Sequence, residues 1–303
     1  MWELRHRQIL AGLLEALAAR GVQALVIKGT ALAYDLYPDA AWRPRGDTDL
    51  LIGPSDLDRA RELLAAHGFS RPTGENAPAG STQEVWHIVP PGSTAHDIDL
   101  HWQAFNGPSL APVIPVEEAM AEGLPLPRLA PEARGLSRGH GLLHSCIHRA
   151  QHILSPYFVD GKAHYGGDRL IWLYDIDLLA GALNAGEWES FASRAIARGV
   201  APVCRGALEE AQRLLGTPLP GDVMARLGAA PEGAVTRYLL GSGRKGRAMA
   251  DLRASGAGGA WRYLRARLLP PAAFVRGQYP HSRWPLPFLY LRRIGRFVTG
   301  RRQ

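Results

Sequence analysis

The spacing of apolar residues in the N-terminal third of the chain predicts an alternation of helices and short strands. Leucines at helical spacing lead up to Gly21, whereas short apolar runs bounded by glycine and proline indicate buried strands. The expected helices span 3–20, 31–37 and 56–67, and the expected strands span 23–27, 47–52, 84–89 and 95–102. This order predicts an α+β fold, with a small mixed β-sheet flanked by helices.

From about Pro131 onward the strand signal fades and helical spacing takes over. Helices are expected over 137–155, 168–185, 187–199 and 202–215. After Pro231 the chain is rich in glycine and arginine, and it ends in an aromatic segment interrupted by prolines. We therefore expect three parts, which are a mixed domain over 1–115, an all-α domain over 116–230 and a basic helical extension over 231–303.

Composition narrows the class of protein. The 303 residues are 46% hydrophobic and 21% charged, which excludes wholesale disorder. No apolar run reaches the roughly 18 residues that cross a bilayer, and the charged start lacks the apolar core of a signal peptide. Two cysteines, Cys146 and Cys204, cannot build a disulfide framework. These features predict a cytoplasmic protein.

The net charge of +7 is unevenly distributed. Residues 231–303 carry 15 Lys and Arg against two acids, a net charge of +13, whereas the rest of the chain has 20 basic against 26 acidic residues. Segments 261–269 and 288–297 mix aromatic residues with arginines, as RNA-binding and membrane-surface segments do. A helical cap with arginines along its surface fits the same pattern, so three interpretations stay open.

Aspartates separated by one residue occur four times. The pairs are Asp47/Asp49, Asp56/Asp58, Asp97/Asp99 and Asp175/Asp177. The second pair lies in the first turn of an expected helix, and the fourth lies on a helix where positions two apart point to different faces. The other two pairs lie on expected strands, where alternate residues share a face. Adjacent strands bearing such acids repel each other unless a cation lies between them, which indicates a metal site, and solvated acids at a strand edge are the alternative.

A second group of polar residues precedes these acids. Lys28-Gly29-Thr30 marks a strand-to-helix turn, where backbone amides can approach a phosphate closely. Lys28 adds an ammonium, Thr30 adds a hydroxyl, and Arg43 and Arg45 add forked donors suited to phosphate oxygens.

The order of these motifs resembles the nucleotidyltransferase superfamily typified by DNA polymerase β, and more narrowly a bacterial family of uncharacterised nucleotidyltransferases. The matching motifs are Val26-Ile27-Lys28-Gly29-Thr30, Tyr37-Pro38, Arg43, Asp47-Thr48-Asp49-Leu50-Leu51 and Asp99-Leu100-His101-Trp102. The similarity continues through His144, His148, His152 and Asp175, and it covers about residues 20–190.

The resemblance implies transfer of a nucleoside monophosphate from an NTP such as ATP to a hydroxyl acceptor, with release of pyrophosphate. It implies that Asp47, Asp49 and Asp99 hold two Mg²⁺ or Mn²⁺ ions. Lys28, Gly29, Thr30 and Arg43 would bind the nucleotide. Asp97 lies on the same strand face as Asp99 and is the alternative third acid. The acceptor is expected to be a protein or peptide natural product, a small molecule, an RNA end or another anionic macromolecule.

Four histidines recur every four residues, at positions 140, 144, 148 and 152. Neighbours on such a helix share a face, while the outer pair diverges. With Asp97 and His101, the last three are expected to line the cleft between the domains, and packing or surface histidines are the alternative. A zinc site would need a distant ligand such as Asp168 or Asp175.

Two other functions fit parts of the sequence. One is a non-catalytic nucleotide-binding or antitoxin-like regulatory module, although the complete set of acids favours an enzyme. The other is an RNA-binding or membrane-surface protein that acts through its basic C-terminal segment.

Overall fold

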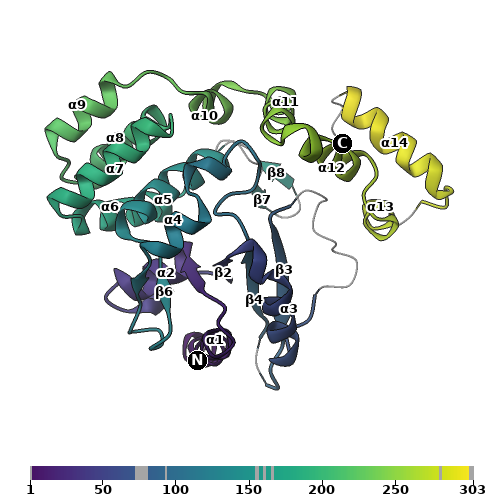
Figure 1. Cartoon of the computed structure of the whole chain (residues 1–303), viewed down its shortest axis with the longest axis horizontal. Coiled ribbons are helices and arrows are strands. Elements are labelled where there is room, and N and C mark those ends of the chain that lie inside the picture. Colours follow the sequence, from purple (N-terminus) through teal and green to yellow (C-terminus); the bar gives the residue numbers. More distant parts are fainter. Residues whose placement is uncertain are drawn as a thin grey trace.

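The computed structural model describes residues 2–71, 81–92, 94–153, 157–159, 162–164, 167–279 and 282–299. These form an α+β fold in which helices surround one mixed sheet and continue as a long helical region (Figure 1). The strands are β1 (Ala24–Ile27), β2 (Asp47–Ile52), β3 (Gln83–Ile88), β4 (His96–His101), β5 (Leu124–Pro125), β6 (Arg134–Gly135), β7 (Tyr157–Val159) and β8 (Lys162–His164). The helices are α1 (Trp2–Ala19), α2 (Lys28–Asp35), α3 (Leu57–Ala66), α4 (Val116–Ala121), α5 (Arg138–Ile153), α6 (Leu170–Ala182), α7 (Ala185–Ala197), α8 (Ala201–Leu215), α9 (Gly221–Ala229), α10 (Ala234–Thr236), α11 (Arg244–Ala254), α12 (Gly256–Leu268), α13 (Ala272–Gln278) and α14 (Leu286–Thr299).

The sheet has six strands in the order β3-β4-β2-β1-β6-β5. Strands β2 and β4 pair in parallel, and so do β1 and β6, while the other neighbours are antiparallel. Its last two strands come from residues 124–135, beyond the boundary expected at residue 115, and the three-part division of the chain stays a prediction. The parallel pairing of β2 with β4 is the feature that positions the acidic residues.

Strand alternation gives the sheet two different faces. Leu50 and Ile52 of β2 and Ile98 of β4 point to one face, where they form a buried cluster with α1 and α3. Leu51, on the opposite face, belongs to a second cluster shared with α5 to α8. The aspartates of β2 and β4 point to this second face, toward the helical region.

The helical region is built around α5, which packs against α6, α7 and α8. Cys146 and Cys204 are both buried and free in this core, as their packing role predicts. No helix in the part of the chain that is described combines the length and the apolar character that a membrane crossing requires.

The expected elements match the structure apart from short segments. Helix α2 begins at Lys28, three residues before the expected start, because β1 passes directly into it. Strands β5 and β6 and the hairpin β7–β8 were not expected, since two- and three-residue strands are too short to show alternation.

Candidate active site

The turn between β1 and α2 places Lys28 in an unusual backbone conformation. Lys28 has φ +57°, and it is the only non-glycine residue among those described with a positive φ. This conformation is uncommon for a lysine and is found mostly where a site requires it. It directs the ammonium at Asp49, to whose Oδ1 the Lys28 Nζ donates. Ile27, the residue before α2, provides no side-chain cap, so the amides of the first turn lack that partner.

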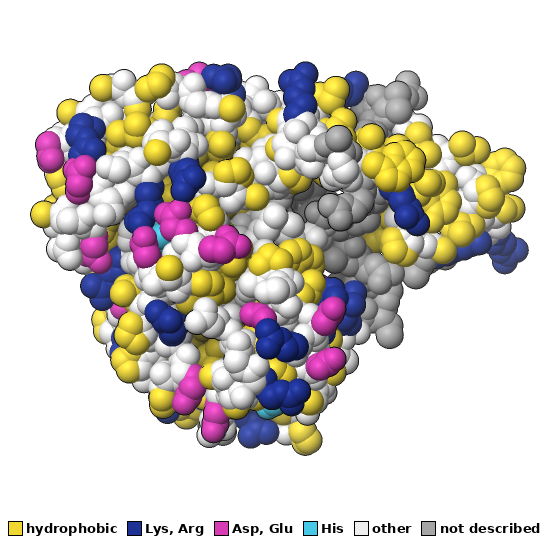
Figure 2. All heavy atoms as spheres, viewed as in Figure 1, with side chains coloured by type: hydrophobic (Ala, Val, Ile, Leu, Met, Phe, Trp, Pro, Cys, Tyr) yellow, Lys and Arg dark blue, Asp and Glu magenta, His cyan; other side chains and the backbone are white. Residues whose placement is uncertain are grey.

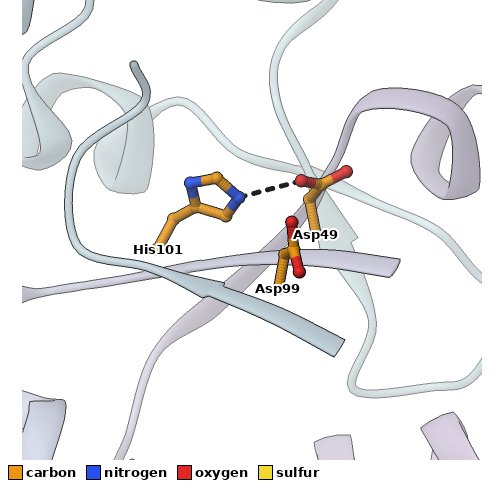
Figure 3. Close-up of side chains that lie close together, drawn as sticks. All are labelled: Asp49, Asp99 and His101. Atoms are coloured by element: carbon orange, nitrogen blue, oxygen red, sulfur yellow. Dashed lines mark hydrogen bonds and ion pairs between the residues drawn. The ribbon is translucent and has the colours of Figure 1, made fainter. Parts of the chain in front are cut away.

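The parallel register of β2 and β4 aligns the acids in pairs. Asp47 lies opposite Asp97, and Asp49 lies opposite Asp99. Asp49 Oδ1 also lies 2.8 Å from His101 Nε2, as Figure 3 shows together with Asp99 beside them. The strand pattern therefore correctly placed the two Asp-x-Asp pairs on adjacent strands and on one face.

The pKa values of the carboxylates on this face are shifted in opposite directions. Burial opposes ionisation of Asp49, but the Lys28 ammonium and the His101 ring outweigh it and hold the pKa of Asp49 below its usual range. Burial, reinforced by the charges of Asp49 and Asp47, raises the pKa of Asp99 to about 7. Burial and Asp49 also raise the pKa of Asp47. The cluster carries more negative charge than Lys28 balances.

This donor set fits a divalent cation. One ligand atom each from Asp49, Asp99 and His101 lie within 4.8 Å of one another. Carboxylate oxygens are the ligands that Mg²⁺ and Mn²⁺ prefer, and a cation would relieve the repulsion that raises the pKa values of Asp47 and Asp99. The Nδ1 atom of His101 is buried and has no hydrogen-bond partner among the described residues.

A cleft of about 1570 Å³ opens over these residues. Lys28, Gly29, Asp47, Asp49, Asp99 and His101 line its sheet side. Its other walls come from α5 and α6 and from the C-terminal segment, which contributes Arg247, Asp251 and Tyr263. Asp97 does not line the cleft, so the geometry favours Asp99 over Asp97 as the third acid.

The side chain of Thr30 lies away from the cleft. It is buried, and its hydroxyl oxygen lies 2.9 Å from Thr48 Oγ1 and accepts a hydrogen bond from Arg45 Nε at 3.0 Å. Because α2 begins at Lys28, the third residue of the turn already points into the protein. The expected contact between the Thr30 hydroxyl and a phosphate therefore does not fit the structure.

Arg43 has a protein partner at the bottom of the cleft. Its Nε and Nη2 donate to the two carboxylate oxygens of Asp175 at 2.9 and 2.8 Å, and the Tyr37 hydroxyl donates to Asp175 Oδ1 at 2.7 Å. A Cβ at Gly29 would lie 3.3 Å from Arg43 Nη2, so this glycine is the residue that leaves room for the guanidinium. Arg43 thus connects the turn at Gly29 to Asp175 of α6.

Three of the four spaced histidines face the cleft. His144, His148 and His152 line it, with ring centroids of consecutive members 6.1 and 4.2 Å apart. Burial lowers the pKa of each, to about 3 for His144, so these rings are neutral at physiological pH. His140 instead lies 3.1 Å from Glu118 Oε1. The expected divergence of the outer pair is confirmed.

The structure offers no support for the zinc alternative within the residues that are placed. Arg43 holds Asp175, and Arg149 holds Asp168. In the described ranges, Asp49, Asp99 and His101 are the group of histidine, cysteine and acidic residues arranged to hold a metal ion.

Gln83 is a site residue that the sequence did not indicate. It starts β3, opposite His101, and its Nε2 donates to Asp99 Oδ2 at 3.1 Å. Asn106 in turn donates to Gln83 Oε1, so the amide orientation is fixed from a second loop. The pairing of β3 with β4 creates this contact, and a single sequence carries no signal for it.

Comparison with known proteins gives one family match. Residues 2–216 match the family described as uncharacterised nucleotidyltransferase. Among solved structures, the chain is similar to an antigenic nucleotidyltransferase-like protein from Paracoccidioides brasiliensis, with 14% identity and a TM-score of 0.45 over 78% of this chain and 97% of that one. No curated protein matches the chain.

Proposed function

Because the chain belongs to the family of uncharacterised nucleotidyltransferases, we propose that it transfers a nucleoside monophosphate from an NTP to a hydroxyl acceptor. In this reaction the acceptor oxygen forms a bond to the α-phosphorus, the bond from that phosphorus to the bridging oxygen breaks, pyrophosphate leaves, and the hydroxyl proton is released. The observation that carries the proposal is the parallel register of β2 and β4, which brings Asp47, Asp49 and Asp99 together in the cleft.

Asp47, Asp49 and Asp99 are the residues that would hold the divalent metal, which we propose to be two Mg²⁺ or Mn²⁺ ions. When bound, such ions neutralise charge on the triphosphate and stabilise the charge that develops during transfer. The fit rests on the raised pKa values of Asp47 and Asp99 and on the close grouping of Asp49 with Asp99.

The remaining residues of the turn suit the triphosphate. Gly29 lines the cleft without a side chain, so phosphate oxygens can approach the amides at the start of α2. The Lys28 ammonium, now at Asp49, lies within reach of an anion bound beside that carboxylate. The Asp99 carboxylate lines the cleft, and in this proposal it helps to activate the acceptor hydroxyl by accepting its proton.

The outer cleft suggests an acceptor with negative charge. Arg169 and Arg247 line it, one from the start of α6 and the other from α11. A phosphorylated or acidic peptide, including a peptide natural product, offers both a hydroxyl and anionic groups that arginines bind.

Calorimetric titration tests the donor half of the reaction without an acceptor. Wild-type protein is titrated with ATP, GTP, CTP and UTP in Mg²⁺ or Mn²⁺, beside the variant Asp47→Asn/Asp49→Asn. The matched control is Asp58→Asn, which removes an exposed acid of α3. We expect metal-dependent binding of at least one nucleotide, lost in the double variant and kept in the control. Absence of binding to all four by folded wild-type protein contradicts the proposal, and binding without any turnover in an acceptor screen favours a regulatory module.

A further inference from the structure

The C-terminal helices form an outer arm of the molecule. Helices α13 and α14 pack against each other, and Val275 of α13 and Leu289 of α14 are fully buried. The pair connects to the rest through α12, which contacts α14 and α11. Figure 1 shows α13 and α14 at the end of the helical region, away from the sheet. This arm lies beyond residue 216, where the family match ends.

Large apolar side chains of the arm are exposed to solvent. On α14 and just before it, Trp284, Phe288 and Leu291 are 51%, 56% and 64% exposed. Phe288 and Leu291 are three residues apart and so share one side of α14, whereas Leu289 turns inward. Trp261 and Leu264 of α12 are also exposed. Figure 2 shows hydrophobic side chains gathered over the α13–α14 end of the molecule. Exposed groups of this kind mark interaction sites.

The charge of the arm is strongly positive. Residues 256–299, which span α12 to α14, contain eight arginines and no acid, and the longer segment 231–303 contains 15 Lys and Arg against two acids, so the acids of the segment can pair with only a few of these cations. Of the two acids, Asp251 is buried and accepts hydrogen bonds from Tyr238, Tyr263 and the amide of Ser109. Arg292, next to the apolar stripe, lies with its guanidinium 5.1 Å from the centre of the Tyr279 ring and 5.7 Å from that of Trp284.

We propose that the arm formed by α12, α13 and α14 binds an anionic lipid surface, an inference that goes beyond the nucleotidyltransferase reaction. Exposed Trp, Phe and Leu side chains enter the boundary between headgroups and acyl chains, while arginines contact the anionic headgroups. Aliphatic Leu264, Leu269 and Leu291 have no role in stacking on nucleobases, and Arg292 already lies over the Trp284 ring. These two features favour lipid over single-stranded RNA.

Docking through this arm would bring the cleft to the lipid surface. Helix α12 carries Trp261 and Leu264 on its exposed side and Tyr263 in the wall of the cleft. Asp251, which also lines the cleft, ties α11 to the loop after β4 through Ser109. The reaction would therefore take place on acceptors near a membrane surface.

Co-sedimentation with vesicles tests the inference. The full-length protein is mixed with vesicles of phosphatidylcholine alone or of phosphatidylcholine with phosphatidylglycerol. We expect binding only to the mixed vesicles, weakened by salt, and weakened about tenfold or more in Trp284→Ser/Phe288→Ser/Leu291→Ser. The matched control Leu4→Ser/Val89→Ser/Leu214→Ser removes exposed apolar groups elsewhere and should bind like the wild type.

A second variant separates charge from folding. Arg283→Gln/Arg292→Gln leaves the apolar residues in place and should also lose affinity for the mixed vesicles. Each variant should keep wild-type helix content by circular dichroism and wild-type calorimetric behaviour with NTPs, so that the lipid result stands apart from the donor site. Any of three results would overturn the inference. These are no binding to mixed vesicles, an equal loss of affinity in the control variant, and displacement of the protein from vesicles by single-stranded RNA at concentrations lower than that of the lipid.

Discussion

The ion pair between Arg43 and Asp175 should hold the sheet and the helical region together. Asp175 is 4% exposed, and its carboxylate accepts from Tyr37 and from two nitrogens of Arg43. Of these donors, Arg43→Ala leaves the buried carboxylate only the Tyr37 hydroxyl. The loss of one partner from such a pair costs about 3–5 kcal/mol of unfolding free energy. Tyr37→Phe removes one hydrogen bond to this buried carboxylate and should cost about 1.5–3 kcal/mol.

The pH dependence of this loss follows from the pKa of Asp175. Burial already raises that pKa, although Arg43 and Tyr37 act against the increase. Without Arg43 the pKa rises further above the value in the unfolded chain, so the folded state loses stability as the pH rises through that pKa. Arg43→Ala should therefore be more destabilising at about pH 8 than at about pH 5, where protonation of Asp175 relieves part of the cost.

Urea unfolding of the wild type, the two single variants and Arg43→Ala/Asp175→Leu measures these effects. The double variant should recover part of the loss, since an apolar side chain replaces the unpaired charge. Arg213→Ala, which breaks an exposed pair with Glu210, is the control and should cost less than about 1 kcal/mol. If Arg43→Ala costs no more than this control at both pH values, Arg43 does not brace the fold, and a nucleotide contact becomes its main role.

Three further predictions concern charge, metal and backbone. Burial, Arg45 and His96 lower the pKa of His6 from 6.5 to about 3, so protonation of His6 favours the unfolded chain. The free energy of unfolding should therefore fall by about 2 kcal/mol as the pH is lowered from about 8 to about 5. His6→Gln should flatten this pH dependence in urea unfolding, and an unchanged slope would contradict the prediction. Mn²⁺ at a hundredfold excess over its Kd should raise the Tm of the wild type and of Asp97→Asn by roughly 5–10 °C but not that of Asp99→Asn, and an equal rise in all three would remove Asp99 from the metal site. Gly199 has φ +68° and its Cβ would lie 3.0 Å from Gly233 Cα, so Gly199→Ala should cost about 1–3 kcal/mol; Gly216→Ala, at φ +75° with open space, should cost only about 1 kcal/mol in the same unfolding assay.

Much of the sheet and its acidic face could be predicted because both rest on local patterns. The alternation in Asp97-Ile98-Asp99-Leu100 encodes two faces of one strand, and the structure has Ile98 and Leu100 in the core below. The repulsion between the two strands that carry aspartates could also be predicted from the sequence, since it depends only on these strands being neighbours. The order of the strands within the sheet was not predicted, because no local pattern contains it.

Contacts between distant segments could not be predicted in the same way. The hydrogen bond from Gln83 to Asp99 depends on the register of β3 against β4, and the bond from the Ser109 amide to Asp251 joins residues 142 positions apart. Thr30 shows a finer difficulty, because a helix that begins three residues earlier than expected turns its hydroxyl from the cleft into the core. A turn motif thus indicates a phosphate site without fixing which of its side chains reaches the ligand.

The cluster of like charges in the site is unfavourable in the ligand-free protein, and a ligand of matching charge would explain why the fold keeps it. Asp47 and Asp99 lie on adjacent strands with raised pKa values, while Lys28 stays in a rare conformation with its ammonium at Asp49. Both features lower the stability of the ligand-free protein, and neither improves packing. A bound cation and triphosphate would relieve the repulsion and give Lys28 an anionic partner. On the proposed function, the stability that the ligand-free protein lacks would be recovered as binding energy for a metal–NTP complex, which carries both a cation and an anion.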